Sequence, residues 1–181
     1  MIWRNTPHSF GRISRLLHWA MALLVIGMLV LGNRIADLQP GLANLWLYGL
    51  HKGIGMSLLA LALLRVIWHH VTPPPRPIGT GLQTQAARAV HLAFYLLLLA
   101  IPLVGWVASS ATGLDVMLFD RWRVPGIAPV SEVWEKTGFA LHATLTKLLV
   151  ALISLHVLAA LKRGWDGDGT LRRMWRGRAQ G

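Results

Sequence analysis

The sequence contains no cysteine. A chain without cysteine cannot form a disulfide, hold an iron–sulfur cluster through thiolates, or attach a haem through the C-x-x-C-H motif of c-type cytochromes. Acidic residues are also scarce, with seven aspartates and glutamates against eighteen lysines and arginines in 181 residues. Any cofactor of this chain is therefore bound without cysteine.

Long apolar segments account for much of the chain. Hydrophobic residues make up 54% of the sequence, and the mean hydropathy is +0.50. A helix that spans the hydrocarbon core of a bilayer needs about 20 mostly apolar residues. Four segments meet this requirement, at about residues 14–32, 51–68, 90–109 and 139–161, and each is apolar on nearly all faces, as lipid exposure requires. We predict an all-α membrane protein in which a single domain, residues 1–181, forms a four-helix bundle.

The first apolar segment follows basic residues, as the apolar part of a cleaved signal peptide does. It is longer than the roughly 7–15 apolar residues of a signal peptide, and no convincing A-x-A cleavage site follows it. We expect this segment to be the first membrane helix.

The net charge of +11 is distributed unevenly. Twelve basic residues lie before or at the start of the first segment, around the connection between the second and third, or after the fourth: Arg4, Arg12, Arg15, Arg65, Arg76, Arg88, Lys162, Arg163, Arg172, Arg173, Arg176 and Arg178. The opposite side has five basic and five acidic residues: Arg34, Lys52, Arg121, Arg123, Lys136, Asp37, Asp115, Asp120, Glu132 and Glu135. The positive-inside rule then places both termini in the cytoplasm, and the basic rim suits anionic lipid head groups better than nucleic acid.

Histidines lie near the ends of all four segments, and an ionisable side chain inside a bilayer commonly marks a functional site. His142 and His156 on the fourth segment are fourteen residues apart. At about 100° and 1.5 Å per residue they lie within about 40° of the same helix face and about 21 Å apart along the axis. A helix that supplies one axial ligand to each of two stacked haems needs this arrangement. The alternative is two helix-end histidines that only bond their neighbours.

The histidine that would pair with His142 follows from counting the histidines on the outer side. His51, at the start of the second segment, is the only other histidine on the outer side. An outer haem with two histidine ligands would therefore be held by His51 and His142. Gly53 and Gly55 follow His51 and would leave room for a macrocycle against the backbone.

The inner partner of His156 stays open at this point. Three inner histidines lie in the tail or about 27 Å along the second helix from His51, too close to the surface to match the depth of His156: His8, His69 and His70. His18 and His91 remain, and their positions alone do not separate them.

Apart from Arg15 and Lys52 at the starts of their segments, two charged residues lie within the apolar segments. Arg65 follows His51 by fourteen residues, which places it on the haem-facing side of the second helix at the depth of the inner haem. Its guanidinium could pair with a haem propionate, or it could snorkel to the inner head groups. Lys147 lies deeper, in the fourth segment, and the sequence assigns it no role.

Several motifs together resemble the bacterial cytochrome b561 family: Leu17-His18-Trp19, Leu50-His51-Lys52-Gly53-Ile54-Gly55, the proline-rich run after the second segment, Val90-His91-Leu92, and His142 with His156. The resemblance extends from about Arg12 to Trp175. It is nearest to the small four-helix, di-haem, quinone-linked type, whose known activity is superoxide oxidation. It implies a multi-pass protein of the bacterial inner membrane with two haems b.

The resemblance also implies ligands and substrates. By position, each iron has two histidine ligands: His18 and His156 at the inner haem, and His51 and His142 at the outer haem. Superoxide would give its electron at the outer side, and ubiquinone would be reduced at the inner side near His91, which would supply a proton. Lys162-Arg163 depart from the type, which has a further histidine after the fourth helix.

Three functions fit these features. The first is an oxidase that passes electrons from superoxide to ubiquinone, with Lys52 and Arg121, Arg123 or Lys136 attracting the superoxide anion. The second is a relay cytochrome b subunit between quinone and a partner redox protein. Short connections offer such a partner little surface, and this favours the first function, the superoxide oxidase. The exception is residues 110–138, where we expect a short amphipathic element. The third is a small transporter without redox chemistry.

Overall fold

The computed structural model describes residues 2–39 and 41–177; Pro40 and Arg178 lie outside them. Four long helices follow one another: α1 (Arg12–Ala36), α2 (Leu45–Val71), α3 (Leu82–Ala111) and α4 (Glu132–Trp165). A 3-10 turn, η1 (Leu42–Asn44), precedes α2, and a short helix, α5 (Thr170–Arg176), follows α4. All four long helices are long and apolar enough to cross a membrane, which confirms the predicted fold. Each extends beyond its predicted segment: mostly polar turns continue α1, α3 and α4, whereas the apolar run Leu45–Leu50 adds to the start of α2.

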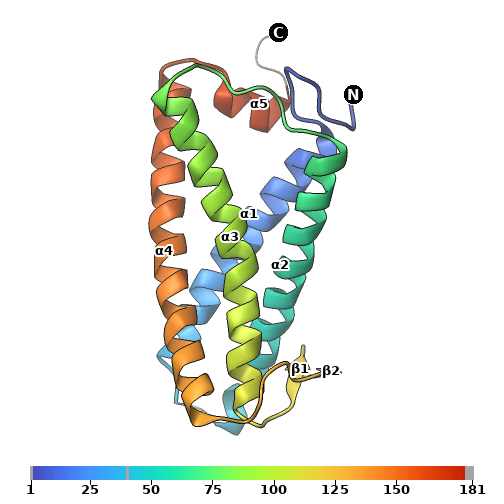
Figure 1. Cartoon of the computed structure of the whole chain (residues 1–181), viewed down its shortest axis with the longest axis vertical. Helices are drawn as coiled ribbons and strands as arrows, with labels where there is room; N and C mark the ends of the chain where they lie inside the picture. Colours follow the sequence, from blue (N-terminus) through green and yellow to red (C-terminus); the bar gives the residue numbers. More distant parts are fainter. Residues whose placement is uncertain (1, 40, 178–181) are drawn as a thin grey trace.

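One end of the bundle carries residues 2–11 and α5, and the opposite end carries a β-hairpin (Figure 1). Hydrogen bonds hold the first end together. The Asn5 side chain donates to the Thr72 carbonyl at 2.9 Å, and the buried Arg173 donates to the Arg76 carbonyl at 3.0 Å. The basic residues concentrate here, so the positive-inside rule assigns this end to the cytoplasm.

The hairpin consists of β1 (Val116–Leu118) and β2 (Trp122–Val124), which pair antiparallel. It replaces much of the amphipathic element expected at 110–138, and α4 already begins at Glu132. Its turn needs positive φ, at 52° for Phe119 and 54° for Asp120, a conformation that non-glycine residues rarely adopt. The Phe119 N–H donates to the Gly49 carbonyl at 3.0 Å, so the hairpin is attached to the outer end of α2.

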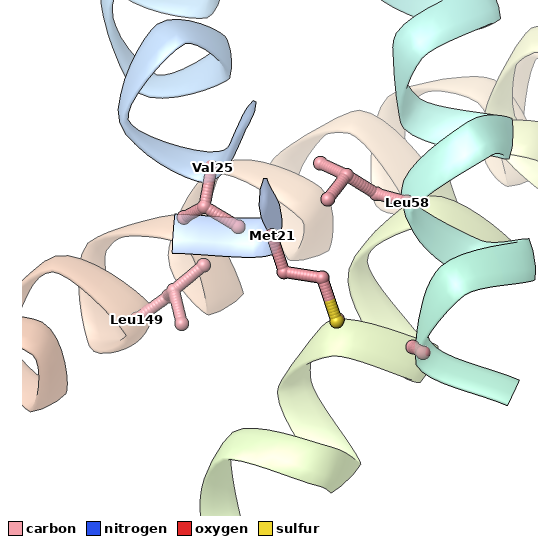
Figure 2. Close-up of a cluster of buried hydrophobic side chains, with 5 residues drawn as sticks. Met21, Val25, Leu58 and Leu149 are labelled. Carbon is pink, nitrogen blue, oxygen red and sulfur yellow. The ribbon is translucent and has the colours of Figure 1, made fainter. Parts of the chain in front are cut away.

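The buried core lies in the middle of the bundle. Met21 and Val25 of α1, Leu58 of α2 and Leu149 of α4 converge there, with Ala62 beside them (Figure 2). Leu149 lies seven residues from both histidines of α4, on nearly the same helix face. The core is therefore an apolar layer between two histidine levels.

Small residues bring α3 and α4 close together at their outer ends. A Cβ added at Gly138 of α4 would lie 2.8 Å from the Cβ of Ala108 on α3, which leaves no space for a side chain. Close approach through small residues is the usual way in which membrane helices pack. This contact sets the position of the helix that carries His142.

Candidate functional site

His51 of α2 and His142 of α4 meet near the outer end of the bundle. Their ring centres are 6.1 Å apart and their planes are inclined by 64°. The Nδ1 of His142 lies 2.9 Å from the Ile101 carbonyl oxygen. A carbonyl only accepts, so Nδ1 donates, and Nε2 of the neutral ring keeps its lone pair for a metal. The Nδ1 of His51 is buried and has no hydrogen-bond partner in the described part of the chain.

Glycines on neighbouring helices make room for these two rings. A Cβ at Gly105 of α3 would lie 3.0 Å from Nδ1 of His142, and one at Gly32 of α1 would lie 3.3 Å from Cε1 of His51. Optimal contact distances for such atoms are about 3.5–4.0 Å. A methyl group at either position would therefore require the neighbouring histidine ring to move by a few tenths of an ångström, and the sequence reasoning missed both glycines.

Gly53 and Gly55 have different surroundings from those expected. The ring of Phe119 covers Gly53, where an added Cβ would lie 2.6 Å from Cε1 of that ring. Gly55 faces the end of Met28, with 3.7 Å available. The absence of a side chain at Gly53 thus allows Phe119 of the hairpin to pack directly against α2, because any side chain there would displace Phe119.

His156 has two histidine neighbours at the inner end of the bundle. Its ring centre is 6.4 Å from that of His18 on α1 and 5.9 Å from that of His91 on α3. Phe94 packs edge-on against it, with ring centres 5.2 Å apart. The structure brings all three histidines together, so proximity to His156 does not separate His18 from His91.

A polar chain lies beside these rings. Arg65 reaches the Nδ1 of His18 at 3.4 Å with one nitrogen and donates to the Tyr95 hydroxyl at 3.2 Å with another. That hydroxyl lies 2.8 Å from Nδ1 of His69. His69 therefore joins the inner cluster, although its distance along α2 predicted a place nearer the surface, because the long Tyr95 side chain spans from α3 to α2. In the sequence, the i,i+4 spacing of Arg65 with His69 and of His91 with Tyr95 could have indicated that these four side chains lie together.

The outer cations expected to attract an anion are mostly neutralised. Two of them form ion pairs with exposed acids: Arg123 with Asp115, and Lys136 with Glu132. Asp120 attracts the charge of Lys52. The guanidinium of Arg121 stacks over the ring of Trp122 at 5.5 Å and forms no ion pair with any residue that the structure describes.

The paired histidines at two depths of a four-helix membrane bundle agree with a comparison of sequences. The sequence model for prokaryotic cytochrome b561 matches residues 9–177. The chain belongs to this family. It is therefore a membrane electron-transfer protein, multi-pass in the bacterial inner membrane, and haem b is the cofactor that the family implies.

Three relatives of this cytochrome b561 span nearly its full length. Cytochrome b561 homolog 2 of Escherichia coli (strain K12) is 37% identical over 96% of this chain and 95% of its own. A protein named probable superoxide oxidase CybB, of Yersinia pestis, is 27% identical over 87% of this chain and 90% of its own. Cytochrome b561 homolog 1 of Escherichia coli (strain K12) is 26% identical over 92% and 97%.

Proposed function

We propose that this cytochrome b561 holds two haems b and oxidises superoxide at its outer face while reducing ubiquinone at its cytoplasmic face. The observation that carries the proposal is the pair of facing histidines at each end of one face of α4. The likeness to the Yersinia pestis protein, 27% identical, supports superoxide as the electron donor.

The spacing of the histidine pairs fits two-histidine ligation of iron. A metal–nitrogen bond of about 2 Å on each side, with about 1 Å from each nitrogen to its ring centre, separates two ring centres by about 6 Å. The outer pair, His51 and His142, is at 6.1 Å and the inner pair, His18 and His156, at 6.4 Å. The apolar layer around Leu149 lies between them, which supports two separate haems.

His18 is the proposed inner partner of His156, with Arg65 beside it. A guanidinium only donates, so in its contact with Arg65 the Nδ1 of His18 accepts and Nε2 carries the proton. Ligation through Nε2 thus requires Arg65 to turn away from His18. A haem propionate is the anion that would attract it, which is the role predicted for Arg65.

A haem b held by two histidines has no open iron position and supplies one-electron transfer. Two superoxide anions each give up one electron and leave as dioxygen, and ubiquinone takes both electrons with two protons to become ubiquinol. Arg121 is the cation proposed to attract superoxide, because Arg123 and Lys136 are paired with acids and Asp120 offsets the charge of Lys52.

The quinone head group is proposed to bind at the inner ends of α2 and α3. His91 is exposed there and is the proposed proton donor, since histidine changes charge near neutral pH. The Nε2 of His69 is buried without a hydrogen-bond partner among the described residues, and a quinone carbonyl oxygen would provide one. Tyr95 holds His69 in this position.

Two measurements on the purified protein test the proposal. A pyridine haemochrome assay should give two haems b per chain, and superoxide consumption should increase when ubiquinone is added. Replacing His51 or His142 with alanine should remove one haem, whereas replacing the exposed His70 should remove none. A ratio of one haem per chain contradicts the architecture. Superoxide consumption that ignores quinone, in a protein with two haems, favours the relay function instead.

A further inference from the structure

Lys147 is a charged side chain near the middle of α4 that electron transfer does not use. Its side chain is exposed, and none of the ion pairs among the described residues includes it. The sequence assigned it no role. A lysine at this depth of a membrane helix requires a partner or a path to water.

The side chain of Lys147 projects away from the bundle. Successive residues of an α-helix turn by about 100°, so Lys147 lies about 160° round α4 from the buried Leu149 and about 180° from His156. Both of these residues face the interior. Lys147 therefore faces the lipid and cannot reach the proposed haem sites.

A stripe of small and hydroxyl-bearing residues runs through Lys147, beside larger exposed side chains such as Val150 and Leu158. Its members recur every three or four residues and are all exposed: Thr137, Ala140, Thr144, Ala151 and Ser154. The hydroxyls of Thr144 and Ser154 donate to carbonyls of their own helix, at 2.9 and 3.0 Å. We call these residues, with Lys147, the Lys147 face. Small residues allow another helix to approach closely, and lipid tails alone do not require them.

Neither lipid tails nor snorkelling satisfies Lys147. Lipid tails offer no hydrogen-bond acceptor for an ammonium group. The exposed ion pair of Lys136 with Glu132 marks the outer end of the same helix. Lys136 is eleven residues away, about 16 Å along the axis, and a four-carbon side chain reaches much less far. An acceptor must therefore come from a neighbouring helix within the membrane.

We propose that the Lys147 face packs against the transmembrane helix of a partner protein that carries a carboxylate at mid-membrane depth. A carboxylate supplies both the acceptor and the opposite charge that a desolvated ammonium needs. A second copy of this chain does not fit. All of its acids lie toward the ends of the long helices or in the connections: Asp37, Asp115, Asp120, Glu132, Glu135, Asp166 and Asp168. A twofold dimer through this face would also bring two copies of Lys147 together.

The test uses the full chain with its haems in phosphatidylcholine vesicles and a designed single-span helix of leucine and alanine. One version of this peptide has glutamate at mid-span, and matched versions have glutamine or leucine there. Energy transfer between labelled peptide and protein measures association. The glutamate peptide should associate with the wild-type protein at least about tenfold more tightly than the leucine peptide. Lys147→Met should abolish this difference, and Lys136→Met, at the exposed outer end of the same helix, should keep it.

Equal association of the glutamate and leucine peptides with the wild type would overturn the proposal, as would unchanged binding of the glutamate peptide by Lys147→Met. Because the chain has no native cysteine, Ala151→Cys gives a single cross-linking site on the Lys147 face. Efficient cross-linking between two copies, lost on adding Lys147→Met, would assign the face to a second copy and also overturn the proposal. Lys147→Met should keep both haems and superoxide consumption, so this result is separate from the test of the proposed function.

Discussion

Gly105→Ala places a methyl group where α3 passes the ring of His142. The added Cβ would lie 3.0 Å from Nδ1 and 3.1 Å from Cε1 of that ring. Comfortable contact needs about 3.5 Å or more, so the ring must move by roughly half an ångström unless α3 and α4 separate. The Nδ1–H of the ring donates to the Ile101 carbonyl at 2.9 Å, and this hydrogen bond should weaken when the ring moves.

The size of the effect follows from that hydrogen bond. Its net free energy is about 0.5–1.5 kcal/mol. In the proposed outer haem site, a bonded Nδ1–H would make the imidazole of His142 a more basic ligand, which favours oxidised iron, so weakening the bond should raise the reduction potential. One electron converts about 1.4 kcal/mol into about 59 mV. The outer haem should therefore shift upward by no more than about 40 mV for a loss of about 1 kcal/mol.

An optical redox titration, following the α bands of the two proposed haems, measures this shift. The inner haem should keep its potential because the apolar layer of Figure 2 lies between the two sites. Gly27→Ala is the matched control, since nothing lies within 4 Å of its added Cβ. If Gly105→Ala leaves both potentials unchanged, or shifts only the inner haem, then Gly105 does not position a ligand of the outer haem.

Three further predictions concern other parts of the molecule. Gly53→Ala should detach the hairpin, because its Cβ would meet the Phe119 ring at 2.6 Å, and proteolysis should then cut the hairpin faster than in the wild type. His91→Ala should keep both haems and their reduction by superoxide while quinone reduction slows about 10²-fold or more; loss of the inner haem would instead make His91 its ligand. Burial raises the pKa of Asp168, but hydrogen bonds from a backbone N–H and from Arg163 lower it below its usual value overall. The stabilisation by Asp168 should thus be present above the ordinary carboxyl pKa and be lost as pH falls through the lowered value. Hydrogen-exchange protection of α5 should therefore fall as pH drops from the ordinary carboxyl pKa to the lowered value, and protection that stays constant through this window would contradict the prediction.

The four helices and the outer histidine pair were predictable because they depend on periodicity and counting. A helix returns to the same face after fourteen residues in any packing, so His142 and His156 had to share a face. Only His51 was available on the outer side, and the structure brings it to 6.1 Å from His142. Whether these histidines bind iron stays a prediction.

The inner cluster and the hairpin depend on contacts between separate elements, which the periodicity of a single segment does not fix. His69 joins the cluster through the Tyr95 hydroxyl at 2.8 Å, and this contact depends on how α2 and α3 pack. The strands of the hairpin have three residues each, too few for alternation to appear. Its turn uses positive φ at Phe119 and Asp120, where glycine or asparagine would have been the recognisable signal.

The two ends of the bundle differ in the way that the proposed reaction requires. Oxidation of superoxide neither consumes nor releases a proton, so the outer site needs only an electron acceptor and positive charge nearby. There His142 is held by a backbone carbonyl, a group that does not exchange protons. Quinone reduction consumes two protons, and the inner end places Tyr95, His69 and His91 in one cluster beside His156. A cluster of tyrosine and histidine groups able to carry protons thus accompanies His156 at the cytoplasmic end, where the proposed quinone reduction must take its protons.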